Sequence, residues 1–315
     1  MIYALSTGEL TALLYLCGKE CMPLSPFHDG TKEPERPNRL EEKASGLVAM
    51  GLCRMTAENP VLTDTGRLLA DVLTDPENVT SAERKNTSDP AVNILTRKGL
   101  FCLHQWFPDR HLHVIQPFLT RKLTIRWLNE NLLNGWSPTE ENRKKTDLLL
   151  SYDAWICFLI SQFLFMRRSL RRRPVSENFT VNELRDCSIL SYLNTSLTAL
   201  GTKRYAGAVQ YLFQEENTEV LADAIRQLCE KGVWEILPER TENGEQQFRY
   251  SRETILNLDN DRLEDTMLLT VCRKEMPPCR LLLSLRTNGI LALMDDGEQV
   301  HLTSAPRLDW ELYLD

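Results

Sequence analysis

Two histidines provide the first candidate for chemistry in this sequence. His111 and His113 lie two residues apart, so in a β-strand both imidazoles would point to the same side. Such a pair can hold a metal ion when a third ligand is close. On its own the spacing is more typical of surface histidines, and we expect neither a metal nor another cofactor.

Known catalytic motifs are absent from the sequence. It contains no G-x-S-x-G nucleophile elbow, no G-x-x-x-x-G-K-[ST] or G-x-G-x-x-G phosphate loop and no H-E-x-x-H zinc motif. The nine cysteines are odd in number and form no C-x-x-C pair, which is typical of reduced thiols in a cytosolic protein. We therefore expect a cytoplasmic protein that is not an enzyme.

The charge of the chain disfavours nucleic acid as a partner. The 315 residues are 42% hydrophobic and 26% charged, as in typical globular proteins, and the formal net charge is −7. A protein that grips phosphates usually carries an excess of Lys and Arg, because cationic side chains supply most of that affinity. We expect no nucleic acid partner.

Two short segments carry the same helix-start signal. Ser6 stands three residues before Glu9, and Thr180 stands three residues before Glu183, each ahead of an apolar run. This is the spacing of a capping box, in which a hydroxyl and a carboxylate satisfy the exposed N–H groups of a helix start. The C-terminal half therefore begins like the N-terminal half.

A second helix in each half also has a counterpart in the other half. Both helices have one apolar stripe and end at a glycine, with equal spacing from the first leucine to the glycine. The residues are Leu40, Ala44, Leu47, Val48 and Gly51 in one half, and Leu221, Ile225, Leu228, Cys229 and Gly232 in the other. A hairpin is predicted after each glycine, with turns at 58–60 and 243–244.

Antiparallel strands are expected after the hairpins. Residues 99–119 and 266–285 each indicate two apolar strands separated by a polar loop with proline, and residues 288–302 add two short strands. The polar stretch 75–98 is expected to form a loop or a weak helix. The matching order of these elements indicates an internal duplication.

The segment 136–175 joins the two halves. Ser137 begins a helix-start signal, and residues 148–166 are apolar around almost the whole circumference of a helix, with five arginines after them. Nineteen residues approach the length that crosses a bilayer, but Asp153 and a glutamine lie inside the run. We favour a buried connecting helix, while a docking face or a membrane contact through 148–173 stays an alternative.

The sequence thus predicts an α+β fold of two pseudo-symmetric, repeated lobes joined by a long apolar helix. Each lobe has two helices and a hairpin, as in a winged-helix domain, followed by antiparallel strands. The expected parts are an N-terminal lobe at 1–135, a connecting helical segment at 136–175 and a C-terminal lobe at 176–315. One integrated domain is the alternative.

The winged-helix plan makes a transcriptional regulator the second functional hypothesis. A recognition helix needs donors that reach base edges and cations that hold phosphates. The two candidate helices instead carry mostly acids on their exposed sides: Glu41, Glu42 and Lys43 in one, and Glu219, Asp223, Arg226 and Glu230 in the other. Because carboxylates repel a phosphate backbone, a binding protein for other proteins is the first hypothesis.

The order of elements resembles the EspG-type chaperones of type VII secretion. The resemblance rests on the capped first helix, the loop MPLSPFHDGTKEPERPN, the helix ending GLVAMGL, the strand and helix in PVLTDTGRLLADVL, the DPENV segment, and the second cycle of these elements. It implies a cytosolic protein of two lobes around β-sheet that holds small helical secretion substrates soluble before export. The clients would be LXG- or WXG-type helical hairpins bound in a groove.

Aromatic residues in polar surroundings are the candidates for partner contact. The resemblance implies that sheet-connecting loops touch the partner, and the matching loop here is WFPDRHLH. Apolar area in a polar turn usually needs a cover, and aromatic residues are enriched at binding hot spots. The expected contact residues are Trp106, Phe107, Pro108, His111, Trp127 and Trp136. Packing of each side chain against its own lobe is the alternative.

Overall fold

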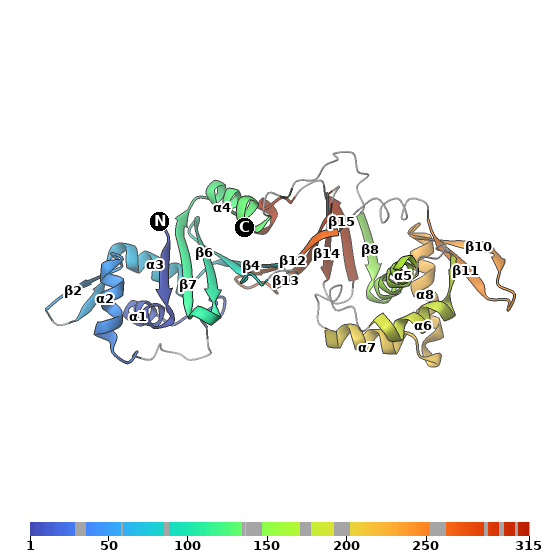
Figure 1. Ribbon diagram of the computed structural model, residues 1–315, viewed down its shortest axis with the longest axis horizontal. Helices are drawn as coiled ribbons and strands as arrows, with labels where there is room; N and C mark the ends of the chain where they lie inside the picture. The colour runs from blue at the N-terminus through green and yellow to red at the C-terminus, as the bar shows by residue number, and fades with distance from the viewer. Residues whose placement is uncertain are drawn as a thin grey trace. The chain divides into compact units, whose positions relative to one another are not determined.

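The computed structural model has an α+β fold that separates into two compact units (Figure 1). The first unit contains residues 1–137, 267–279 and 308–315, and the second contains 138–266 and 280–307. The structure describes the chain in the following ranges: 1–28, 36–57, 59–84, 88–133, 136, 147–170, 178–191, 202–251, 263–286, 289–295, 299–305 and 308–314.

An antiparallel sheet forms the centre of the first unit. Its strands are hydrogen-bonded in the order β1-β7-β6-β5-β4-β12, so β1 pairs with the last strand of a meander. A short 3-10 helix, η1, connects β6 and β7. The bounds are β1 (Tyr3–Ser6), β4 (Asn78–Arg84), β5 (Val92–Arg97), β6 (Leu100–Phe107), η1 (Pro108–Arg110), β7 (Leu112–Leu119) and β12 (Leu263–Arg273).

Three helices cover one face of this sheet, here called the inner face. They are α1 (Thr7–Cys17), α2 (Leu40–Ala49) and α3 (Asp64–Thr74), with the hairpin of β2 (Cys53–Met55) and β3 (Pro60–Leu62) between the last two. Ser6 and Glu9 form the predicted capping box at the start of α1. The buried side chains of the helices pack against sheet residues that include Tyr3, Leu5, Leu95, Cys102 and Ile115.

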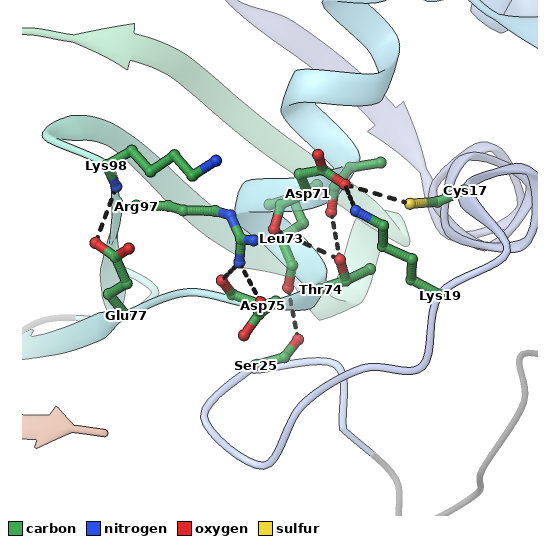
Figure 2. A network of polar contacts seen from close by, with 11 residues as sticks. Cys17, Lys19, Ser25, Asp71, Leu73, Thr74, Asp75, Glu77, Arg97 and Lys98 are labelled. Atoms are coloured by element: carbon green, nitrogen blue, oxygen red, sulfur yellow. Dashed lines mark hydrogen bonds and ion pairs between the residues drawn. The ribbon is translucent and has the colours of Figure 1, made fainter. Parts of the chain in front are cut away.

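A network of polar contacts ties the loop after α1 to the end of α3 (Figure 2). Lys19 forms an ion pair with Asp71, and Ser25 Oγ donates to a carbonyl oxygen in the last turn of α3 at 2.7 Å. Arg97 of β5 forms an ion pair with Asp75, which follows α3 directly. These contacts fix the end of α3 against both the loop and the sheet.

The face opposite α1, α2 and α3 is here called the outer face of the first-unit sheet. The elements that lie over it are α4 (Arg121–Trp127), the π-helical segment η2 (Leu128–Leu132) and α10 (Glu311–Leu314). Trp310 is buried, and its Nε1 donates to Asn129 Oδ1 at 2.9 Å. This bond joins the C-terminal segment to η2.

In the second unit the strands are hydrogen-bonded in the order β13-β14-β15-β8, and a smaller sheet has the order β10-β11-β9. The strands are β8 (Asp147–Ser151), β9 (Asn178–Thr180), β10 (Trp234–Arg240), β11 (Gln246–Tyr250), β13 (Cys279–Arg286), β14 (Gly289–Asp295) and β15 (Gln299–Ala305). The helices are α5 (Tyr152–Leu170), α6 (Val181–Ser191), α7 (Thr202–Leu212), η4 (Glu215–Asn217) and α8 (Thr218–Glu230).

Helix α5 is the central element of the second unit. It packs against α6, α7 and α8 and against β8. Its residues 154–160 are buried together with an aromatic cluster from the small sheet, formed by Phe179, Trp234, Phe248 and Tyr250. The apolar character of α5 around its whole circumference is explained by this burial.

The polar stretch 75–98 forms strands instead of the predicted loop or weak helix. It contains β4 and β5, which pair in antiparallel register with Val79 opposite Leu95. Strand β4 forms because distant parts of the chain contact it, and one of them is β12, which pairs with it. Thr80 is buried, and its Oγ1 donates to the carbonyl oxygen of Tyr313 at 2.6 Å, a partner more than 200 residues away.

The apolar run at 148–166 is also divided differently from the prediction. Its first residues form β8, and α5 begins at Tyr152. Ser151 Oγ accepts a hydrogen bond from Ala154 N at 3.2 Å, which is the contact of an N-cap residue. Pairing with β15 draws the leucines of β8 into the sheet. The predicted helix start at Ser137 lies outside the described residues.

The contacts divide the chain at other places than the predicted boundaries. The expected connecting segment 136–175 belongs almost wholly to the second unit, and residues 267–279 and 308–315 return to the first. Helix α5 is thus part of a core instead of a link. Within the described ranges, no helix is long and apolar enough to cross a membrane.

Candidate binding surface

The outer face of the first-unit sheet carries apolar side chains at its β1 end. Directly paired residues point to the same side of an antiparallel sheet, so Ala4, Val114 and Gln105 lie in one row across β1, β7 and β6. Leu112 and Phe107 pair in the next row. Ala4 is exposed, and Val114, Leu112 and Phe107 are half-buried. Apolar area on this face therefore remains open to solvent.

A hollow of about 250 Å³ lies beside these rows, and Phe107 and Trp127 both line it. Pockets that take a whole small molecule usually measure about 300–1,000 Å³, so this hollow suits a few side chains of a partner. The other lining residues are Arg84, Asp89, Pro90, Val92, Gln105, Asn131 and Leu132. They come from the end of β4, from the residues just before β5, from β5 and β6, and from η2.

Helix α4 supplies one wall of the hollow. It begins at Thr120, whose Oγ1 accepts from Leu123 N at 3.4 Å. Leu123 and Trp127 are four residues apart and share one side of the helix. Asn131 extends that side, since its Nδ2 donates to the carbonyl oxygen of Trp127 at 2.9 Å. Leu123 is 50% exposed although it is apolar, so the apolar stripe continues from the hollow onto the surface.

Positive charge accompanies this stripe. Over α4 and η2 the charged residues are Arg121, Lys122, Arg126 and Glu130, which gives a net charge of +2. Arg126 Nε donates to Glu130 Oε1 at 2.7 Å, so that pair is neutral. Asp309 and Glu311 are exposed on either side of Trp310, which bonds to Asn129 of η2, so acids also lie close to this surface.

Trp106 lies on the inner face, although it precedes Phe107 directly. Its ring stacks on His113 with the centroids 4.1 Å apart, and Phe27 packs edge-on against the same imidazole. Pro108 is exposed in η1. Of the predicted contact residues in this loop, the structure brings only Phe107 to the hollow that Trp127 lines.

His111 and His113 do not form the pair that a metal site would need. His111 lies before β7, is exposed and has a φ of 47°, whereas His113 is buried in the strand. The imidazole of His113 pairs with His104, with His104 Nε2 and His113 Nδ1 3.0 Å apart. Asn93 Nδ2 lies 3.3 Å from His104 Nδ1. An amide nitrogen can only donate, so His104 accepts at Nδ1 and donates from Nε2.

The imidazoles of His104 and His113 are both neutral. Burial, together with the neighbouring His113, lowers the pKa of His104 to about 3, and burial lowers the pKa of His113 to about 4. Nε2 of His113 is buried and has no hydrogen-bond partner among the described residues. Both imidazoles are therefore part of the core of the first unit.

Trp136 does not line the hollow. Its backbone N–H donates to the carbonyl oxygen of Leu133 at 2.8 Å, and its side chain is half-buried. The indole Nε1 is buried without an acceptor in the part of the chain that the structure describes. The residues on both sides of it lie outside that part.

The surface also contains residues that we did not predict. Leu112 and Val114 join it from β7, and Leu123 joins it from α4. The spacing of Leu123 and Trp127 was a visible signal, because residues four apart share a helix face. No comparable signal marked Leu112, since its side of the sheet depends on the strand register.

The two helices that were considered as recognition helices, α2 and α8, carry exposed acids. In α2, Glu41 and Glu42 keep 62% and 67% of their side chains exposed. In α8, Asp223 is 67% exposed and pairs with Arg226 at 2.7 Å. Glu41 and Glu42 also pair with Arg36 and Arg39 at 3.4 Å each, so the exposed acids of both helices are in part neutralised by arginines.

No protein-family model matches this sequence, and a comparison with curated proteins found no match. Among solved structures, the chain superposes on the type VII secretion system chaperone EspG5 of Mycobacterium tuberculosis, solved in complex with a PE25–PPE41 dimer. The match covers 97% of this chain and 92% of that chain, with a TM-score of 0.42 and 8% sequence identity. At this TM-score the superposition establishes neither a common fold nor a common function.

Proposed function

We propose that this protein is a non-enzymatic binding protein that receives a small helical protein on the outer face of its first-unit sheet. The observation that carries the proposal is the apolar surface of Phe107, Leu112, Val114, Leu123 and Trp127, with a hollow beside two of these residues. A soluble protein rarely leaves such residues together in solvent unless a partner covers them.

A helix is the occupant that suits this surface. The sheet face is bounded by α4, so a partner helix can lie on the open strands beside α4 and place side chains at i, i+3 and i+4 into the hollow. Aromatic residues in partly desolvated pockets contribute most of the binding energy at interfaces. Phe107 and Trp127 are the two residues of that kind here.

The biological setting that we propose is a cytoplasmic chaperone or adaptor of type VII secretion. The order of elements in the sequence resembles EspG-type chaperones, which hold helical substrates before export. The clients would then be LXG- or WXG-type helical hairpins. A client held in this way would keep its apolar helix face out of water until export.

A repeated architecture belongs to this proposal, and the helix ends support it. In both halves the backbone N–H of the glycine after the helix donates to the carbonyl oxygen three residues earlier. The next backbone N–H donates to the carbonyl oxygen five residues earlier. In the first half the bonds are Gly51 to Val48 at 2.9 Å and Leu52 to Leu47 at 2.9 Å. In the second half they are Gly232 to Cys229 at 3.0 Å and Val233 to Leu228 at 2.9 Å.

The strand orders support the same duplication. In the first unit, β1 pairs with β7, and β6, β5 and β4 follow in reverse chain order. In the second unit, β8 pairs with β15, and β14 and β13 follow in reverse chain order. The capping boxes also agree, since Thr180 N donates to Glu183 Oε2 at 2.9 Å as Ser6 N donates to Glu9 Oε2 at 2.8 Å.

The described contacts of α2 and α8 do not favour the alternative function, which is a DNA-binding regulator. Exposed carboxylates on α2 and α8 would face the phosphate backbone in a winged-helix complex. Such an arrangement costs binding energy, because like charges repel and counterions are not released. The acids of α2 and α8 are compatible with a protein partner.

Co-expression tests the proposal. The protein is produced together with small helical proteins encoded beside its gene, captured by an affinity tag, and passed over a sizing column at physiological salt. We expect a stable complex with one of them and no retention of a duplex DNA fragment. Retention of DNA, with no helical protein co-eluting, would overturn the proposal.

Two substitutions connect that complex to the surface. Trp127→Ala should abolish co-elution or weaken it by at least about tenfold, which is the usual effect of removing a buried aromatic anchor. Leu68→Ala is the matched control, because Leu68 is 52% exposed on α3, on the other side of the sheet. Equal loss in both variants would contradict the location that we propose.

A further inference from the structure

We infer that the partner helix anchors in the hollow through a tyrosine or a tryptophan, whose ring packs on Phe107 and Trp127 while its O–H or N–H group donates to the side chain of Gln105. The inference rests on the proposed function, and it adds the chemical class of the anchor and the residue that selects it. It is carried by an amide side chain that stands among apolar residues at the hollow.

Gln105 is a polar residue in an otherwise apolar row across the outer face. It pairs directly with Val92 in β5 and with Val114 in β7, and Ala4 of β1 continues the row. Directly paired residues have their side chains on the same side of an antiparallel sheet, so the Gln105 amide lies between two valine side chains. Gln105 and Val92 both line the hollow.

The side-chain amide of Gln105 has no hydrogen-bond partner among the described residues, although the residue is half-buried. A partner helix on the open strands would take the rest of this amide out of water. An amide that is covered without a hydrogen bond costs binding energy, because its bonds to water are lost and not replaced. A partner that covers Gln105 with apolar groups alone is therefore disfavoured.

A second acceptor lies in the wall of the hollow. Asn131 donates from Nδ2 to the carbonyl oxygen of Trp127 at 2.9 Å. A carbonyl oxygen can only accept, so this bond fixes the orientation of the Asn131 amide and leaves its Oδ1 as an acceptor. Within the described residues no group donates to that oxygen. The hollow thus offers an amide oxygen from Asn131 and another from Gln105, and a donor on the partner suits both.

The charged residues of the hollow argue against lysine or arginine as that donor. Arg84 and Asp89 line the hollow with opposite charges, and both already interact with other groups. A cation that entered would lose its hydration without a free carboxylate to replace it, which is costly. An aromatic ring is favoured instead, because the rings of Phe107 and Trp127 pack well against another ring. Tyrosine and tryptophan combine such a ring with a hydrogen-bond donor.

Two synthetic helices that differ by a single hydroxyl group test the inference. Both are labelled with fluorescein, and both carry leucines at i and i+7 and alanine at i+4. The central residue at i+3 is tyrosine in one peptide and phenylalanine in the other. Binding to the full-length protein is followed by fluorescence anisotropy. We expect the tyrosine peptide to bind about tenfold more tightly, because its O–H group pairs with an amide that phenylalanine would cover and leave unpaired.

Gln105→Leu should remove this preference. The tyrosine peptide should bind about tenfold more weakly to the variant, and the phenylalanine peptide should bind as tightly as before or more tightly. Leucine suits the position, since both neighbours of Gln105 in the row are valines, and an unchanged melting temperature checks that the variant folds. The matched control is Gln210→Leu, the same change at an exposed glutamine of α7, which should keep the tenfold preference.

Equal affinities of the two peptides for the wild type, or an unchanged preference in Gln105→Leu, would overturn the inference. Trp127→Ala separates that result from a failure of the proposed function. If both peptides bind equally and both lose affinity in Trp127→Ala, the surface binds helices but does not select a donor, so the inference fails alone. If neither peptide binds, the inference also fails, and the co-elution experiment still decides the proposed function.

Discussion

At the scale of single residues, the buried histidines are the groups whose ionisation affects stability most clearly. His104 is 2% exposed, and its ring nitrogens lie against Asn93 and His113. A proton on His104 would remove the acceptor at Nδ1 and place a charge in the core. The neutral form is therefore a condition of the fold.

This condition gives a pH dependence with a definite sign. In the unfolded chain an imidazole takes up a proton near its ordinary pKa of about 6.5, whereas His104 in the folded chain does so only near its lowered pKa of about 3. The contribution of neutral His104 to the free energy of unfolding is fully present above pH 6.5, and it is lost as the pH falls towards the pKa of His104 in the folded chain. Each such group adds up to about 1.4 kcal/mol per pH unit to the slope of the free energy of unfolding against pH.

His104→Gln tests this sign. Glutamine keeps an N–H donor for His113 but does not titrate, so the variant should lose less stability than the wild type between pH 6.5 and 4.5. Melting temperatures at a series of pH values measure the slope. His111→Asn is the control, because His111 is exposed and asparagine tolerates its left-handed conformation. Identical slopes in His104→Gln and the wild type would contradict the account.

The residues of the binding surface could be predicted only in part. Phe107 and Trp127 stand out in the sequence as aromatic residues in polar surroundings. Trp106 has the same composition around it, yet it lies on the other face, because successive residues of a strand alternate sides and the register is not visible in the sequence. Leu123 could have been found from its spacing to Trp127.

At the scale of elements, the start of α3 makes a close backbone contact with the chain before the hairpin. A Cβ built on Gly66 would lie 2.0 Å from the carbonyl oxygen of Leu52. That oxygen also accepts from Thr63 N at 2.9 Å. Backbone therefore touches backbone where the hairpin meets α3, and a side chain has no room there.

Gly66→Ala should destabilise the protein by about 1–3 kcal/mol, as expected when a core contact must shift to accommodate a methyl group. Gly207→Ala is the matched control in α7, where an added Cβ meets nothing within 4 Å. Alanine is the better helix former, so this variant should gain about 0.5–1 kcal/mol. Urea unfolding of both variants measures the difference, and a loss of less than 1 kcal/mol in Gly66→Ala would contradict the close contact.

Local signals predicted the elements that local contacts form. The capping box of Ser6 and Glu9 and the helix end at Gly51 need partners only a few residues away, and both are present as expected. Strand β4 depends on pairing with the distant β12, and β8 depends on pairing with β15, so neither could be seen locally. The Ser151 cap of α5 was a local signal that the long apolar run obscured.

At the scale of the whole molecule, the proposed duplication makes a prediction about energetics. Gly51 and Gly232 have φ values of 74° and 68°, and an added Cβ would meet nothing within 4 Å at either place. The cost of alanine is then backbone strain alone, about 1 kcal/mol at each position. Replacement by asparagine, which tolerates this conformation better, should cost less at both.

Chemical unfolding of the four single variants checks this expectation. Similar losses for Gly51→Ala and Gly232→Ala, with smaller losses for the two asparagine variants, would agree with equivalent positions in a repeated plan. A large loss at one position and none at the other would show that the two helix ends are not equivalent. Leu68→Ala serves as the reference for an exposed substitution.

The most direct test of the central claim is a site-specific cross-link from the outer face. A photoreactive phenylalanine replaces Leu123 in one sample and Leu68 in another, two leucines that are 50% and 52% exposed. Each protein is co-expressed with the helical client and irradiated. We expect a cross-linked complex from position 123 and none from position 68. A client that co-purifies but cross-links only from position 68 would contradict the claim that the outer face binds it.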